Sequence, residues 1–118
     1  MNKILLDYEY INERKIFCYS IGYEIVLLRK RNLMTGAELA QKLNISQQQI
    51  SRYERGVSRI SADMLLHILS IFNVSVNDFF ERVSNRVVTL KYKIKYDKDN
   101  KVPFLNVGFL KEVYDVKN

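Results

Sequence analysis

The sequence predicts a mainly α-helical protein, with five short helices followed by a small C-terminal β-hairpin. Three observations favour this fold class. Apolar residues recur at helical spacing from residue 19 to residue 83, capping residues precede most of the expected helices, and from residue 88 the apolar period changes to two. A length of 118 residues suits one domain with a short appendage. We therefore expect an N-terminal extension at residues 1–16, a helical domain at 17–84 and a β extension at 85–118.

Two helices are predicted at the start of the chain. Residues 2–16 can form a short amphipathic helix, and residues 19–31 form the firmer one. In the second, Ile21, Ile25 and Leu28 fall on one stripe at helical spacing.

The next two helices carry clear start and stop signals. Thr35 can cap a helix that runs to about residue 43, and Glu38 stands three positions on, as in a capping box. Asn44 follows where the chain must turn, because Asn tolerates the left-handed conformation. Ser46 can cap a third helix at residues 47–55, and Gly56 is a stop signal.

Serine residues also precede the last two helices. Ser61 caps a fourth helix with the apolar run of residues 64–72. Ser75 caps a short fifth helix, whose first turn contains Asp78.

The expected hairpin follows this helical region. From residue 88 to residue 96 apolar residues alternate with polar ones, which predicts a half-buried strand. Residues 97–101 (DKDNK) are typical of a turn, and residues 102–110 are the expected return strand. Because an isolated hairpin is only marginally stable, this extension is the candidate surface for forming a homodimer.

Composition excludes several classes of protein. No apolar run reaches the roughly 18 residues that a membrane span needs, and the N-terminus lacks the pattern of a signal peptide. Cys18 is the only cysteine, which rules out an internal disulfide and a cysteine-based zinc site and fits a reducing cytoplasm. With one histidine and no glycine-rich phosphate loop, we expect no enzyme and no metal or other cofactor. No segment is large enough for a separate effector domain, so we expect no small-molecule ligand.

Positive charge is concentrated in one part of the chain. The net charge is +6, and the segment from Arg29 to Arg59 contains seven cationic and two acidic residues. A concentrated basic region is typical of a protein with a polyanionic partner. Charge alone leaves a solvated basic face as an equal alternative.

The segment GAELAQKLNISQQQISRYERG adds the features of a helix that reads DNA. Ala40 is small where two helices would cross, and Asn44 makes the turn between them. Apolar residues supply the inward positions of both helices, and polar residues the outward positions of the second. The inward set is Leu39, Leu43, Ile45, Ile50 and Tyr53, and the outward set is Gln47, Gln48, Ser51, Arg52 and Arg55.

These outward residue types can recognise DNA bases. Gln pairs bidentately with adenine and Arg with guanine in the major groove, and the N-terminal part of such a helix reaches the bases first. The predicted base contacts are Gln47, Gln48, Ser51 and Arg52. The predicted phosphate contacts are Thr35, Gln49, Arg55 and Arg59.

The same residues resemble a known family. The run IGYEIVLLRKRNLMTGAELAQKLNISQQQISRYERG is similar to the Cro/C1-type (XRE) helix-turn-helix family, and SADMLLHILSIFNVSVNDFFERV resembles its fourth and fifth helices. The resemblance implies a five-helix, lambda-repressor-like DNA-binding domain and a transcriptional regulator that binds a pseudo-palindromic operator as a homodimer. It also implies that Glu54 pairs within the domain. Many members have Gln at the position of Gly36, where it contacts a phosphate, and Gly36 cannot make that contact.

Two narrower interpretations remain open. The sequence of the helix-turn-helix, together with the short extension, resembles small regulators encoded with enterobacterial fimbrial operons, which control fimbrial and motility genes. Alternatively, the C-terminal extension neutralises a toxin, and the helix-turn-helix serves only autoregulation, as in an antitoxin.

Overall fold

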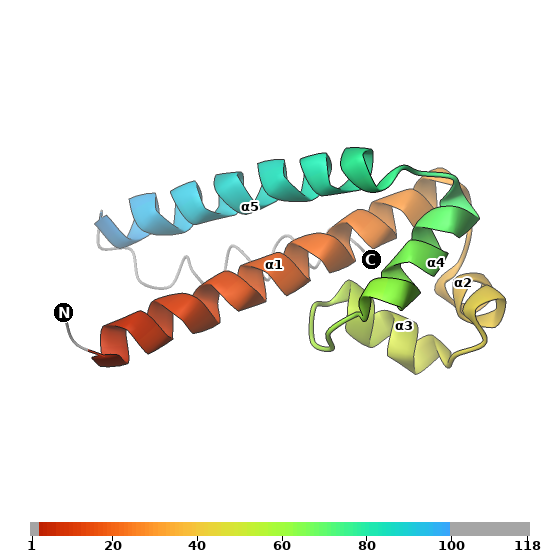
Figure 1. Ribbon diagram of the computed structural model, residues 1–118, viewed down its shortest axis with the longest axis horizontal. Helices are drawn as coiled ribbons and strands as arrows, with labels where there is room; N and C mark the ends of the chain where they lie inside the picture. The colour runs from red at the N-terminus through yellow and green to blue at the C-terminus, as the bar shows by residue number, and fades with distance from the viewer. Residues whose placement is uncertain (1–2, 100–118) are drawn as a thin grey trace.

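The computed structural model describes the backbone of residues 3–99 and the side chains of residues 13–93. Five helices make up this part of the chain: α1 (Lys3–Arg31), α2 (Gly36–Leu43), α3 (Gln47–Glu54), α4 (Ala62–Phe72) and α5 (Val76–Asp99). Figure 1 shows that α1 and α5 form a long pair, and that α2, α3 and α4 lie together at one end of it. No helix within residues 3–99 is long and apolar enough to cross a membrane.

The long first helix replaces the two helices predicted near the N-terminus. α1 continues for 29 residues, so the expected separate helices at residues 2–16 and 19–31 are one element. Ile16 and Tyr19 are buried at 6% and 3% exposure and belong to the same core as Ile25 and Leu28. The helix continues through residues 17–18 because its face is packed on both sides of the expected break.

The last helix overturns the predicted strand at residues 88–96. Residues 88–96 lie in α5, a helix of 24 residues, and no strand occurs within the described part of the chain. Val83, Val87 and Leu90 are each less than 5% exposed, and their spacing of four and three residues is that of a helix face. Packing against α1 therefore overrides the local preference of an alternating, β-branched segment.

Polar contacts fix the antiparallel register of α1 and α5. Arg86 Nη2 lies 2.9 Å from Glu24 Oε1, and the Arg86 guanidinium lies 3.9 Å from the centre of the Tyr23 ring. Nearer the N-terminus of α1 and the C-terminus of α5, Lys91 Nζ lies 2.8 Å from Glu13 Oε1. The predicted turn at residues 97–101 begins inside α5, and the predicted return strand at 102–110 lies outside the described residues.

The predicted helix caps are confirmed. Thr35 and Glu38 form a complete capping box at α2, and Ser46 and Ser61 accept the backbone N–H three residues ahead at α3 and α4. Ser75 Oγ accepts the backbone N–H of Asp78 at 3.0 Å. Asn44 adopts the left-handed conformation, with φ of 57°, as the turn between α2 and α3 requires.

The core places α3 against the rest of the domain. Leu39, Ala40 and Ile50 are at most 3% exposed where α2 and α3 meet, which confirms the small residue expected at this crossing. They join one cluster with Ile68 of α4 and Phe79 of α5. The position of α3 is therefore determined by helices from both ends of the domain.

Candidate nucleic-acid interface

The outer surface of α3 is polar, as the sequence predicts. Ile50 is 1% exposed on the inner face, whereas Gln47, Gln48 and Arg52 are exposed. Gln49 and Ser51 are half-buried at its flanks. The structure therefore brings the four predicted base contacts together on one short helix, with Ser51 the least accessible of them.

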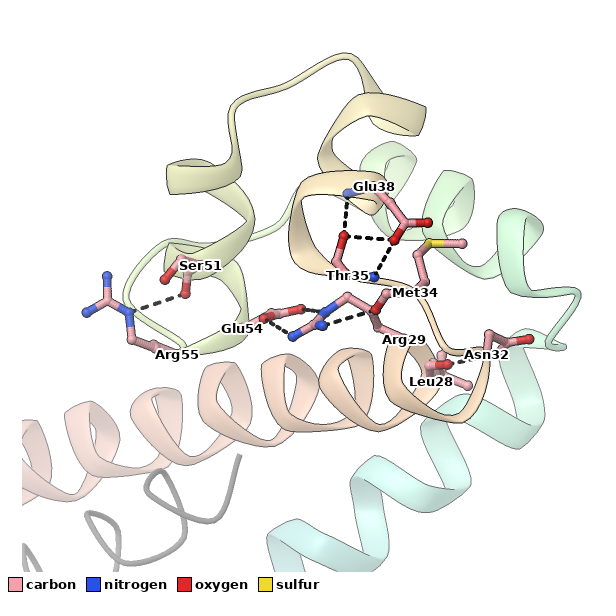
Figure 2. Close-up of polar contacts among 9 residues, drawn as sticks. All are labelled: Leu28, Arg29, Asn32, Met34, Thr35, Glu38, Ser51, Glu54 and Arg55. Carbon is pink, nitrogen blue, oxygen red and sulfur yellow. Dashed lines mark hydrogen bonds and ion pairs between the residues drawn. The ribbon is translucent and has the colours of Figure 1, made fainter. Parts of the chain in front are cut away.

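An ion pair fixes the C-terminal end of α3 to α1. Arg29 Nε lies 2.7 Å from Glu54 Oε2, and Arg29 Nη2 donates to Glu54 Oε1 at 3.1 Å. Arg29 Nη1 also donates to the carbonyl oxygen of Met34, as Figure 2 shows. The expectation that Glu54 pairs inside the domain is confirmed. Arg29, which counted toward the basic region in the sequence, is 15% exposed and has an internal role.

Two glycines allow α3 to approach α1 closely, which sequence analysis missed. A Cβ on Gly22 would lie 2.5 Å from the carbonyl oxygen of Glu54 and closer still to that of Tyr53. Gly56 has a φ of +72°, and a Cβ there would lie 2.7 Å from the backbone nitrogen of Tyr19. A glycine inside a helical pattern was the available signal for the first contact.

Two arginines near the end of α3 have defined orientations. Arg52 Nε donates to Ser58 Oγ at 2.9 Å, so its side chain lies against the loop that follows α3. Arg55 Nε donates to the carbonyl oxygen of Ser51 at 3.3 Å and extends along the helix (Figure 2). Both residues are exposed, and these bonds use only one of the N–H groups of each guanidinium.

At the start of α2, the capping box occupies the hydroxyl of Thr35. Thr35 Oγ1 accepts the backbone N–H of Glu38 at 3.0 Å and donates to Glu38 Oε1, also at 3.0 Å. The Glu38 carboxylate therefore lies at the same helix terminus that is predicted to contact a phosphate (Figure 2). Phosphate binding by Thr35 stays a prediction, and this carboxylate opposes it.

The remaining predicted phosphate contact lies in the loop between α3 and α4. Arg59 is exposed there, next in sequence to the Ser58 that accepts from Arg52. Gly36, at the start of α2, faces Ile50, since a Cβ built on it would lie 3.9 Å from Ile50 Cγ2. Its position therefore has room for a side chain.

Comparison with known proteins finds a matching family and several relatives. Residues 25–79, which span α2, α3 and α4, match the helix-turn-helix family. A protein of Sinorhizobium medicae named as an uncharacterised HTH-type transcriptional regulator is 41% identical over 61 residues, which are 52% of this chain and 44% of that protein. The antitoxin PezA of Streptococcus pneumoniae is 38% identical over 80 residues, 63% of this chain and 51% of that protein. The chain thus spans about half the length of these curated relatives.

Two solved structures share the fold. One is a restriction-modification controller protein, solved as a tetramer in complex with its natural 35 base-pair operator, with a TM-score of 0.54 and 26% identity. The match covers 61% of this chain and 95% of that chain. The clp gene regulator ClgR of Corynebacterium glutamicum has a TM-score of 0.60 at 18% identity, with 78% of this chain and 93% of that one covered, and shows likeness of fold alone.

Proposed function

Residues 25–79 match the Cro/C1-type (XRE) helix-turn-helix family, and from this premise we propose that the protein is a sequence-specific, DNA-binding transcriptional regulator. The observation that carries the proposal is α3 itself. It presents exposed glutamine and arginine side chains outward, while Ile50, Gly22 and the Arg29–Glu54 pair fix its inner side.

The mechanism we propose is binding without catalysis. Gln47, Gln48 and Arg52, with Ser51 beside them, contact base edges in the major groove, each good bidentate pair contributing about 1–3 kcal/mol of discrimination. Arg55 and Arg59 contact phosphates, which fix the register of α3 and make affinity dependent on salt. Gln49 and Thr35 are the weaker members of the phosphate set, because the first is half-buried and the second shares its hydroxyl with Glu38. Occupation of a promoter would then repress transcription, in the cytoplasm and on the nucleoid.

Selection from a pool of random DNA sites tests this function directly. The full chain, at physiological salt, should enrich a consensus sequence. If it acts as a homodimer, the consensus should be pseudo-palindromic, with half-sites about one DNA turn apart. Equal recovery of all sequences would contradict the proposal.

The homodimer is a separate part of the proposal. Up to residue 93, the last whose side chain is described, the exposed large apolar residues of α5 are Val76, Phe80, Val88 and Tyr92. Together with the segment after Asp99 they are the candidate interface. Sedimentation of the full chain should therefore give a dimer that Val88→Glu or Phe80→Glu weakens. Truncation before residue 91 is not a clean test, because Arg86, Val87 and Leu90 pack on α1.

An antitoxin-like protein is the second candidate. The match to PezA supports it, since that match extends over 80 residues, beyond the 61 shared with the rhizobial relative. Copurification of a small partner protein from the native host would favour this function. The narrower resemblance to fimbrial-operon regulators adds fimbrial and motility genes as candidate targets, which transcript levels in a deletion strain would test.

A further inference from the structure

A basic depression lies between α1 and the loop that follows α3. It has a volume of about 240 Å³ and is lined by Arg14, Lys15 and Cys18 of α1 and by Gly56, Val57 and Arg59 of the loop. Figure 1 shows this loop beside the middle of α1. The residues of α1 that contribute to it lie outside residues 25–79, the part that matches the family.

The lining of this depression is suited to an anion. Three of its six residues are cationic and none is acidic. Glu13, which adjoins Arg14 in sequence, has its carboxylate 2.8 Å from Lys91 Nζ. This carboxylate is therefore paired with α5 and is not part of the lining.

The depression is also linked to the helix that carries the predicted base contacts. Gly56 follows Arg55, the C-cap of α3, and lies against the backbone of Tyr19, so the loop is in close contact with α1. Arg52 Nε donates to Ser58 Oγ, and Ser58 immediately precedes Arg59. One loop thus joins a predicted base contact to the basic lining.

We propose that this depression binds a phosphate of the DNA backbone next to the bases read by α3. Arg14 and Lys15 would join Arg59 in contacting it and would extend the DNA-binding surface onto the N-terminal half of α1. The depression would contact a phosphate and no base, so it would add affinity and salt dependence but no sequence preference. This inference rests on the proposed function.

The test compares salt dependence of binding to the selected DNA site. For the variant Arg14→Gln/Lys15→Gln, the slope of log affinity against log salt should become shallower by up to about one, the value for one phosphate contact, with the selected consensus unchanged. The matched control is Arg31→Gln/Arg82→Gln, which removes the same charge from the groove between α1 and α5 and should change the slope less. A second variant, Val57→Lys, adds a cation at an exposed lining position and should strengthen binding and make the slope steeper, by less than about one.

Neutral methylphosphonate groups, placed one at a time along the DNA, identify the phosphate. One substitution should weaken binding of the wild type several-fold and weaken binding of the Arg14→Gln/Lys15→Gln variant, which keeps Arg59, clearly less. If the Arg14→Gln/Lys15→Gln variant binds the selected site with the same salt slope as the wild type or the control variant, this inference alone is overturned. A methylphosphonate scan in which no position has this effect would also overturn it. A wild type without any sequence preference would overturn the proposed function together with it.

Discussion

Arg29 of α1 and Glu54, the last residue of α3, form a two-pronged ion pair across 25 positions of the chain, with Nε 2.7 Å from Oε2 and Nη2 3.1 Å from Oε1. Their side chains are 15% and 10% exposed. The pair joins the end of the proposed reading helix to the longest helix of the domain. Its energetic role is to hold α3 in place, since removal of either partner leaves the other charge buried.

Substitution of Arg29 by Met should lower the free energy of unfolding by about 3 kcal/mol, because Glu54 would remain buried without this cation. Urea denaturation of the full chain measures the loss. The double variant Arg29→Met/Glu54→Leu should recover much of it, because apolar side chains of similar size can replace a buried pair. A single variant as stable as the wild type would contradict a structural role for this pair.

Gly22→Ala should destabilise the domain by about 3 kcal/mol, because its methyl group would collide with the carbonyl oxygens of Tyr53 and Glu54. Gly36→Ala is the matched control. The nearest atom to its methyl group is Ile50 Cγ2 at 3.9 Å, so it should stabilise the domain by about 0.5–1 kcal/mol through the loss of backbone freedom in the unfolded chain. Thermal unfolding distinguishes the two, and equal effects would show that α1 and α3 do not cross as closely as described.

Val87→Ala and Val88→Ala test whether residues 88–96 are helical. In α5, Val87 is 4% exposed and Val88 is 65% exposed. At a protein concentration low enough to keep the chain monomeric, we therefore expect Val87→Ala to lower the free energy of unfolding by about 2 kcal/mol and Val88→Ala to leave it almost unchanged. The predicted strand requires the opposite, because Val88 and Leu90 would share its buried face. Urea midpoints of the two variants decide between these arrangements.

Ser61→Ala should raise the pKa of Asp63. The hydrogen bond from the Ser61 side chain, with smaller contributions from backbone N–H groups, holds the pKa of this exposed carboxyl below its ordinary value. A depressed folded-state pKa stabilises the protein above the unfolded-state pKa, and this stability is lost as pH falls through the folded-state value. Carboxyl carbon NMR titration measures the shift directly. The same variant removes the N-cap of α4 and should cost about 1 kcal/mol at neutral pH, and an unchanged titration curve would contradict the contact.

Local signals in the sequence were sufficient for the small helices. The capping box of Thr35, the Ser46 cap and the turn at Asn44 depend on contacts within four residues, and all three occur as predicted. The outward and inward faces of α3 likewise follow from helical spacing, which is why the predicted base contacts lie together.

The lengths of α1 and α5 depend on contacts that the local sequence does not reveal. The alternation of Val88, Leu90 and Tyr92 indicated a strand, whereas helix α5 forms because Val87 and Leu90 can pack on α1. The crossing at Gly22 and the Arg29–Glu54 pair each join residues at least 25 positions apart. Their partners become evident only once α1 and α3 are placed in space.

Random-site DNA selection with Arg52→Ala beside the wild type tests the central claim, that α3 reads the DNA sequence, most directly. Arg52 is exposed and lies outside the core, so the variant should fold. We predict that the wild-type consensus persists and that one position in each half-site, related by the two-fold axis, loses its preference, at a cost of about 1–3 kcal/mol for the preferred base. A consensus that Arg52→Ala leaves unchanged at every position would contradict the assignment of α3 as the reading helix.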